Sequence, residues 1–172
     1  LAIGDSFRAK VLYSHLTKIE YCKRHEYDFI EDDTVLDKTR PIAWSKIRLI
    51  LKYLSDYDYI VWIDADAMIV DLDQKIEDKI HLMNNKPVMV VKPHGMINTG
   101  VILVKNDPVS FRLMECVYEQ TQFLDEKMGP NWEQDAFIYV YQNDISGLSN
   151  SIEIGDFSVE KYIQVYLPDF YP

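Results

Sequence analysis

Two carboxylates one residue apart, Asp64 and Asp66, follow directly on an apolar segment of the chain. Residues 59 to 63 have the composition of a buried strand, and more apolar residues come after the second carboxylate. Because residues i and i+2 of an extended segment point to the same side, we expect both carboxylates to face one point at the end of a strand. Two like charges that close repel each other unless a cation lies between them. Mg²⁺ and Mn²⁺ are the natural candidates, since they take oxygen ligands and bridge to substrate phosphates.

The composition of the chain excludes several other functions. Its 172 residues, 48% of them hydrophobic, predict a single domain over residues 1–172 with one packed core. The net charge of −10 argues against a nucleic-acid surface, because phosphate backbones are bound through clustered Lys and Arg. Cys22 and Cys116 are too few for a disulfide framework, and we interpret both as buried thiols.

The ends of the chain bear on its location in the cell. It begins without Met at a segment typical of the end of a strand, so we expect an incomplete N-terminal strand, and the chain could be one domain of a longer polypeptide. No apolar run approaches the roughly 20 residues of a membrane span, and no Asn-x-Ser/Thr acceptor occurs. These features favour the cytoplasm for the chain as given, or the Golgi lumen if an N-terminal anchor has been lost.

Helical and strand patterns alternate around the paired carboxylates. The first helix is predicted over residues 6 to 24, followed by a short strand over residues 27 to 30. Its expected apolar face consists of Phe7, Val11, Leu12, Leu16, Ile19 and Cys22. A second helix is predicted to bury Trp44, Ile47, Ile50, Leu51 and Leu54, with Lys46 lying off this face.

The second half of the chain continues the alternation. A helical stretch is predicted over residues 73 to 83, and nearly continuous apolar strands over residues 87–91 and 101–104. Asp107 with Pro108 predicts the start of a helix that runs toward Leu124, and a last helix is predicted over residues 132–141. The pattern indicates an α/β domain with a mostly parallel central sheet flanked by helices. Ligands of such sheets gather at the carboxyl ends of the strands, where Asp64 and Asp66 fall.

Four short motifs match one protein family in order and spacing. They are Trp44-x-Lys46, the run from Trp62 to Ala67, Asn98-Thr99-Gly100-Val101 and Glu133-Gln134-Asp135-Ala136. The chain thereby resembles nucleotide-sugar glycosyltransferases of the Rossmann-like GT-A fold, most closely the galactosyl/mannosyltransferase family that includes xyloglucan xylosyltransferases. The segments at residues 1–5 and 21–28 are also similar to that family, so the resemblance spans about residues 1 to 140.

The resemblance implies a donor site built around the two carboxylates. Asp64 and Asp66 would hold Mn²⁺, with Mg²⁺ as the alternative ion, against the diphosphate of a UDP-sugar such as UDP-glucose or UDP-galactose. Gly4, Asp5 and Arg8 match the turn that approaches the nucleotide, and Lys46 matches a phosphate or ribose contact. Asn98, Thr99 and Gly100 match a loop near the donor sugar, where Gly permits close backbone approach.

The resemblance also implies the reaction. Glu133 and Gln134 match a pair near the reacting carbon, where they would orient the sugar and stabilise its developing positive charge, with an electrostatic role for Gln134. The acceptor would be a hydroxyl of a glycan or another molecule, and the family retains the stereochemistry of the donor. The chain departs from the family in one respect: the family has a further His ligand near the end of the catalytic domain, whereas the last His of this chain is His94.

Several alternatives stay open at this point. Lys46 could be a solvated helix residue, and Asn98-Thr99-Gly100 could be a simple turn between strands. An apolar strand ending in Asp-x-Asp is also how haloacid-dehalogenase-like Mg²⁺ phosphatases begin. A non-catalytic module that binds nucleotide sugars is the third possibility.

Overall fold

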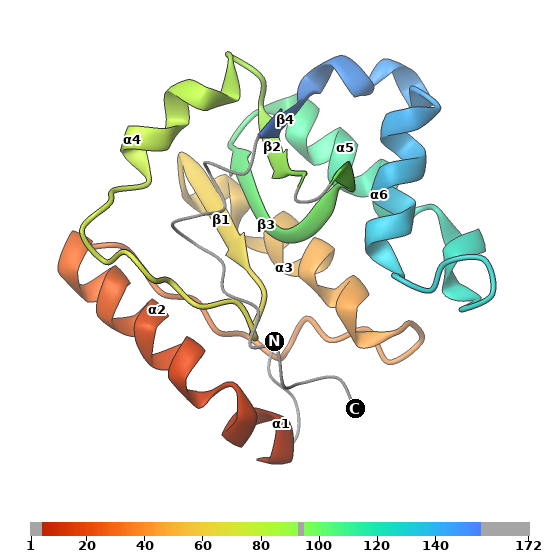
Figure 1. Ribbon diagram of the computed structural model, residues 1–172. Helices are drawn as coiled ribbons and strands as arrows, with labels where there is room; N and C mark the ends of the chain where they lie inside the picture. The colour runs from red at the N-terminus through yellow and green to blue at the C-terminus, as the bar shows by residue number, and fades with distance from the viewer. Residues whose placement is uncertain (1–4, 93–94, 156–172) are drawn as a thin grey trace.

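The computed structural model describes residues 5–92 and 95–155, which form one sheet with helices around it (Figure 1). The first half of the chain contains α1 (Asp5–Lys10), α2 (Leu12–His25), η1 (Ile42–Trp44), α3 (Ser45–Tyr53), η2 (Leu54–Asp56) and β1 (Tyr59–Ile63). Next come α4 (Glu77–Ile80), η3 (His81–Met83), β2 (Val88–Val91), β3 (Asn98–Lys105) and α5 (Pro108–Tyr118). The described part ends with η5 (Thr121–Leu124), α6 (Glu133–Gln142), η6 (Ile145–Gly147), η7 (Ser149–Ser151) and β4 (Ile152–Gly155). The predicted α/β class is confirmed.

The four described strands form a mixed sheet in the order β1-β3-β2-β4. Strand β3 runs antiparallel to both β1 and β2, and β4 runs parallel to β2. The expectation of a mostly parallel sheet is therefore wrong for this part of the chain. Residues 92 to 97 between β2 and β3 are too few for the crossover that parallel neighbours need, so the two strands turn back on each other.

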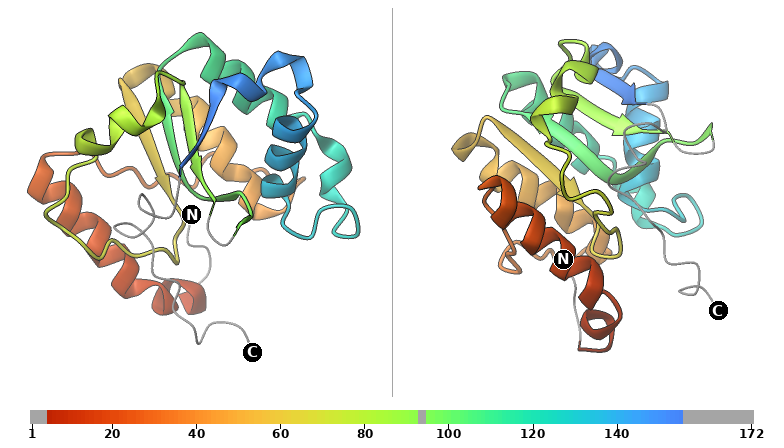
Figure 2. Two further views of the ribbon diagram at one scale, coloured as in Figure 1. Left: turned by 45° about the horizontal axis from the view of Figure 1, so that its top comes forward. Right: turned by 60° about the vertical axis from the view of Figure 1, so that its left-hand side comes forward.

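Strands β2 and β3 are buried on both faces, as their continuous apolar runs predicted, whereas in β1 only Trp62 is buried. One face of the sheet carries α3, α5 and α6 (Figure 2). The core on this face includes the fully buried Ile50, Ile102 and Phe137. The other face is covered by the segment around α4, where Met83, Met89 and Leu103 pack together. The predicted helix start at residues 107 and 108 is confirmed, because the Asp107 carboxylate accepts a hydrogen bond from Val109 N at 2.8 Å.

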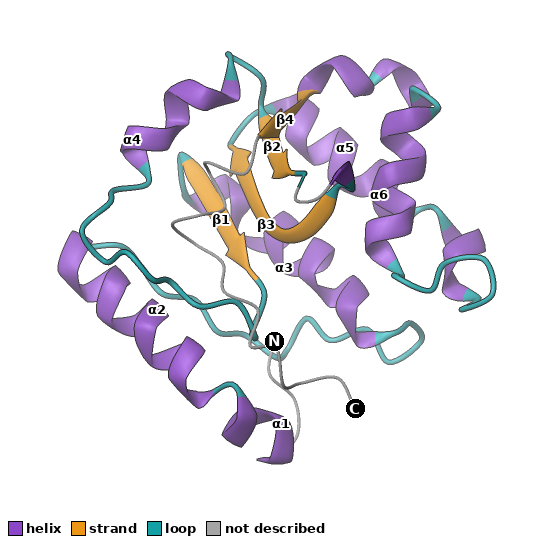
Figure 3. Cartoon of the chain, in the orientation of Figure 1, coloured by secondary structure: helices purple, strands orange, loops and turns teal. Residues whose placement is uncertain are grey.

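The helix predicted over residues 6 to 24 is divided at Val11 into α1 and α2. Apart from Val11, the buried face of α2 is not the predicted one. Its inward side carries Val11, Ser14, Lys18 and Tyr21, whereas Leu12, Leu16 and Ile19 are 48%, 49% and 39% exposed. A hollow of about 590 Å³, lined by both elements, lies between α2 and β1. The helix instead lies along the loop between β1 and α4, which Figure 3 shows beside it. Polar side chains face inward because that loop offers backbone groups rather than apolar side chains.

The predicted strand over residues 27 to 30 is absent from the described structure, in which these residues are irregular. They follow Glu26, a helix C-cap in the left-handed region with φ of 60°, and line the hollow. The Tyr27 hydroxyl holds the segment by donating to the Glu77 carboxylate and accepting from Ile76 N. Side-chain contacts therefore replace a ladder of backbone hydrogen bonds here.

None of the described helices has the length and apolar composition needed to cross a bilayer. The cellular compartment stays a prediction.

Candidate functional site

The two carboxylates lie in a turn at the end of β1. The strand ends at Ile63, and Ala67 N donates to the Asp64 carbonyl at 3.1 Å, so residues 64 to 67 turn instead of continuing extended. The sequence argument for their common direction, which assumed an extended segment, therefore does not apply. Asp64 N donates to Gly100 O at 2.7 Å, which ties the start of the turn to β3.

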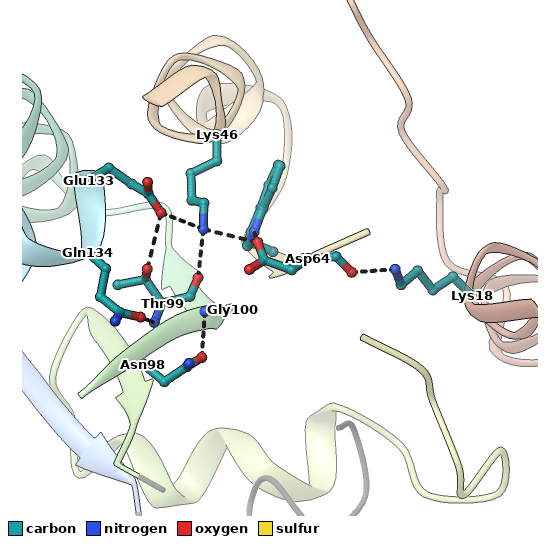
Figure 4. Close-up of polar contacts among 9 residues, drawn as sticks. Lys18, Lys46, Asp64, Asn98, Thr99, Gly100, Glu133 and Gln134 are labelled. Carbon is teal, nitrogen blue, oxygen red and sulfur yellow. Dashed lines mark hydrogen bonds and ion pairs between the residues drawn. The ribbon is translucent and has the colours of Figure 1, made fainter. Parts of the chain in front are cut away.

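The Asp64 carboxylate is held on one oxygen by two donors. Its Oδ1 accepts from Lys46 Nζ at 3.0 Å and from Trp62 Nε1 at 2.7 Å, as Figure 4 shows for the lysine. The side chain is still 35% exposed. One oxygen is thus fixed by the protein, and Oδ2 is left for another partner.

Lys46 lies at the centre of a buried network. Its side chain is 5% exposed, and Nζ contacts Glu133 Oε1 at 2.7 Å and Thr99 O at 3.1 Å besides Asp64 (Figure 4). The interpretation of Lys46 as a solvated helix residue is therefore wrong. Burial would lower the pKa of this lysine, but the charges of Asp64 and Glu133 outweigh burial and raise it above its ordinary value.

The segment Asn98-Thr99-Gly100 connects this network to α6. It forms the first residues of β3, so the expectations of a loop or a turn there are both wrong. Thr99 N donates to Gln134 Oε1 at 3.0 Å, the Thr99 hydroxyl donates to Glu133 Oε1 at 3.3 Å, and Gly100 N donates to Asn98 Oδ1 at 2.7 Å (Figure 4). A register shift between Val90 and Val91 lets this end of β3 leave regular pairing with β2.

The first turn of α6 supplies Glu133 and Gln134. Glu133 is 3% exposed, and its Oε2 is buried with no hydrogen-bond partner among the described residues. Gln134 is half-buried, and since a backbone N–H can only donate, its amide must present oxygen to Thr99. With its oxygen toward Thr99, Gln134 points its NH₂ group away from Thr99. This NH₂ group can donate to another molecule.

Asp66 carries the least compensated charge of the site. Burial first, and then the neighbouring charge of Asp64, raise the pKa of its carboxyl. Within the described residues no group of three or more His, Cys, Asp and Glu side chains could hold a metal, so Asp64 and Asp66 would be at most two protein ligands. The residues fit a divalent cation bound through oxygen, because such an ion would relieve the repulsion and take its other ligands from a diphosphate or water.

The structure brings most of the predicted site residues together and leaves others apart. Lys46, Asp64, Thr99, Glu133 and Gln134 belong to one network. Asp5 begins α1 and Arg8 lies exposed in the same helix, where no hydrogen bond within the described structure joins it to that network. Gly4 and His94 lie outside the described residues.

Sequence reasoning missed two residues at this site. Trp62 lies in the core, but its indole N–H also holds Asp64, and its position two residues before that carboxylate was the available signal. Lys18 reaches the same turn from α2, where its Nζ donates to the Asp64 carbonyl at 2.5 Å (Figure 4). Lys18 lies outside the predicted apolar face of its helix and in none of the matched motifs, so the sequence held no comparable signal.

Comparison with known proteins relates the chain to glycosyltransferases. Residues 9–88 match the galactosyl transferase GMA12/MNN10 family. The chain is 28% identical over 123 residues to galactomannan galactosyltransferase 1 of Cyamopsis tetragonoloba, a match that covers 66% of this chain and 28% of that protein. Xyloglucan 6-xylosyltransferase 1 of Arabidopsis thaliana is also 28% identical over 123 residues, covering 66% of this chain and 26% of that protein. The family resemblance inferred from the motifs is confirmed, and the chain spans about a quarter of the length of these relatives.

A solved structure supports the fold. The crystal structure of a glycosyltransferase involved in the glycosylation of the major capsid of PBCV-1 superposes with a TM-score of 0.64. The match covers 86% of this chain and 75% of that one at 19% sequence identity. At this identity the likeness establishes a shared fold.

Proposed function

We propose that this chain is the catalytic part of a glycosyltransferase that moves a sugar from a nucleotide-sugar donor to a hydroxyl of a glycan or another acceptor. The donor is a UDP-sugar, such as UDP-glucose or UDP-galactose. The observation that carries the proposal is the buried network in which Lys46 joins the carboxylate turn to Thr99 and Glu133. A charged network of this kind is costly to bury, and its place at the carboxyl end of β1 is where ligands of α/β folds bind.

Asp64 and Asp66 would hold a divalent cation, Mn²⁺ or Mg²⁺, in this proposal. When bound, such an ion neutralises charge on the diphosphate leaving group. Asp64 offers Oδ2, because Oδ1 is occupied by Lys46 and Trp62. The raised pKa of Asp66 gives the same carboxylate a reason to accept a cation, since its negative charge is the most destabilised of the pair.

Lys46, Glu133 and Gln134 have different tasks in this proposal. The three N–H donors of Lys46 are taken up by Asp64, Thr99 and Glu133. We therefore assign Lys46 the task of holding the carboxylates of Asp64 and Glu133, and not a direct contact with phosphate. Gln134 keeps an NH₂ group available to orient a sugar hydroxyl. The buried negative charge of Glu133, partly balanced by Lys46, favours positive charge at the sugar carbon as the bond to the diphosphate breaks. We take the retaining outcome from the family that the chain resembles.

The first test is metal-dependent release of nucleotide. The protein is incubated with a panel of UDP- and GDP-sugars and candidate acceptors, with and without Mn²⁺, and the released nucleotide is measured. We expect Mn²⁺-dependent release from a UDP-sugar, and we expect Asp66→Ala to abolish Mn²⁺-dependent donor binding. Asp73→Ala is the matched control, because Asp73 lies in the same loop, is 87% exposed and contacts only Arg24 among the described ion pairs.

The alternatives give different results in the same experiment. Hydrolysis of a phosphate ester with Mg²⁺, without turnover of any nucleotide sugar, would mean a haloacid-dehalogenase-like phosphatase. Binding of a UDP-sugar without turnover, with acceptors supplied, would mean a binding module. Donor binding retained in Asp66→Ala would contradict the assignment of the metal site.

A further inference from the structure

Lys18 approaches the carboxylate turn from the side opposite to Lys46. It lies on α2, its side chain is buried, and its Nζ donates to Asp64 O at 2.5 Å and to Ala65 O at 3.1 Å. Ser14, one helical turn earlier, donates to the same Ala65 carbonyl. Lys46 therefore holds the side chain of Asp64, whereas Lys18 holds the main chain of the turn.

Lys18 belongs to a row of side chains on α2 that we call the polar stripe: Ser14, Thr17, Lys18, Tyr21 and His25. These positions share one helix face. The Thr17 hydroxyl accepts from Ile69 N at 3.3 Å, Tyr21 donates to Gln74 O at 2.6 Å, and His25 Nε2 contacts Leu72 O at 2.8 Å. The loop after β1 thus satisfies part of its backbone through side chains of α2.

The two carbonyls that Lys18 binds belong to the turn that carries both carboxylates. An ammonium group supplies three donors and can hold neighbouring carbonyls at once. Rotation of the peptide planes at residues 64 and 65 would move the Asp66 side chain relative to Asp64, and these hydrogen bonds oppose that rotation. A charged donor makes them stronger than hydrogen bonds between neutral groups.

We propose that Lys18 is a positioning residue of the metal and donor site: it fixes the main chain of the turn and thereby the position of Asp66 relative to Asp64. The inference rests on the proposed function, in which these carboxylates hold the ion. In this proposal Ser14 and Lys18 of the polar stripe position the site, whereas Tyr21 and His25 only attach α2 to the loop.

The first experiment measures the turn itself, without any ligand. Amide hydrogen exchange is compared in Lys18→Met, Lys18→Arg and Tyr21→Phe, all metal-free. In Lys18→Met we expect exchange over residues 64–70, which include the Ala67 N–H bound to the Asp64 carbonyl, to quicken about tenfold or more. In Tyr21→Phe the increase should be confined to the neighbourhood of Gln74. Unchanged exchange over residues 64–70 in Lys18→Met would overturn the proposal.

The second experiment measures Mn²⁺ binding by the electron paramagnetic resonance signal of free Mn²⁺, with and without UDP. We expect Lys18→Met to bind Mn²⁺ with UDP about tenfold more weakly than the wild type, and Lys18→Arg to recover most of the loss. The direction is diagnostic, because removing a positive charge without moving the turn would strengthen cation binding. Affinity equal to or tighter than that of the wild type, or an equal loss in Tyr21→Phe, would contradict positioning by Lys18.

The two experiments separate this inference from the proposed function. A wild-type protein that binds neither Mn²⁺ nor UDP would refute the metal site, while the exchange result would still decide whether Lys18 fixes the turn. Thermal unfolding of each variant shows that it is folded. If Lys18→Met does not fold, Ser14→Ala replaces it, because that change removes a hydrogen bond to Ala65 and leaves the charge in place.

Discussion

Helices α2 and α3 each bring a buried lysine to Asp64, yet the two helices are attached to the rest of the protein by different forces. Helix α3 packs Ile47 and Ile50, both at most 1% exposed, into the main core. Helix α2 keeps Leu12, Leu16 and Ile19 on its outer side and contacts the loop after β1 through the polar stripe. The difference shows that an amphipathic helix buries whichever face its neighbour can satisfy: apolar side chains against a sheet, donors and acceptors against a loop.

The pKa values of Lys18 and Lys46 are shifted in opposite directions. The pKa of Lys46 is raised because the charges of two carboxylates outweigh the effect of burial. The pKa of Lys18 is lowered to about 8, chiefly by burial, which the more distant charges of Asp64 and Asp66 do not fully offset. One lysine is a partner in an ion-pair network, and the other is a donor to neutral carbonyls.

The largest expected effect comes from removing the ion-paired lysine. Lys46→Met leaves Glu133 and Asp64 without their common partner, so we expect the free energy of unfolding to fall by about 3–5 kcal/mol in urea denaturation. The double variant Lys46→Met/Glu133→Gln should recover part of this loss, because it also removes the buried charge.

Lys52→Met is the matched control for that prediction. Lys52 lies on the same helix and also pairs with an aspartate, Asp32, but the Lys52 side chain is 44% exposed. We expect little change in stability. A similar loss in both variants would mean that helix packing, not the buried charge network, accounts for the effect.

A second pair of changes tests the two helix faces directly. Ile50→Ala on α3 empties a fully buried position and should cost about 2–5 kcal/mol of unfolding free energy. Leu16→Ala on α2 removes a half-exposed side chain and should change stability by at most about 0.5 kcal/mol. Thermal or urea unfolding of both variants is the measurement, and a large loss from Leu16→Ala would show that the outer side of α2 is covered.

Apart from the control variants, the smallest expected effect is a pH dependence of stability caused by Lys18. A lysine whose pKa falls from 10.5 in the unfolded chain to about 8 in the folded protein carries fewer protons in the folded state between these values. Stability contributed by this group therefore rises with pH from about 8 to 10.5 and is constant below about 8. We expect the unfolding free energy of the wild type to increase relative to Lys18→Met by roughly 1–3 kcal/mol over that window. A difference that stays flat with pH would mean that Lys18 keeps its ordinary pKa.

The sequence predicted those parts of the fold whose side chains meet other side chains. Helix α3, strand β2 and the helix start at Asp107 follow from apolar periodicity and a capping pair, and all three are confirmed. The predictions of the buried face of α2 and of a strand over residues 27 to 30 were wrong. Both lie beside the hollow and the loop after β1, where backbone groups and hydroxyls decide the packing. Periodicity of apolar residues carries no information about such contacts.

The candidate site was predicted to a similar extent. The motifs identified Lys46, Asp64, Thr99 and Glu133, which the structure joins in one network. They could not indicate that Lys46 is buried or that Asn98-Thr99-Gly100 begins a strand, because both facts depend on how β3 and α6 meet in space. Lys18 was missed for the same reason, since its partners are main-chain carbonyls more than forty residues away in sequence.

The two hydrogen bonds to one oxygen of Asp64 would affect the timing of the proposed catalytic cycle. With Oδ1 occupied by Lys46 and Trp62, the carboxylate can offer a cation a single point of attachment. If Asp64 and Asp66 hold an ion as proposed, we expect it to exchange rapidly when it is alone and to stay only while a diphosphate shares it. Ion and nucleotide would then arrive and depart together, so that each departure of the spent nucleotide clears the site for the next donor.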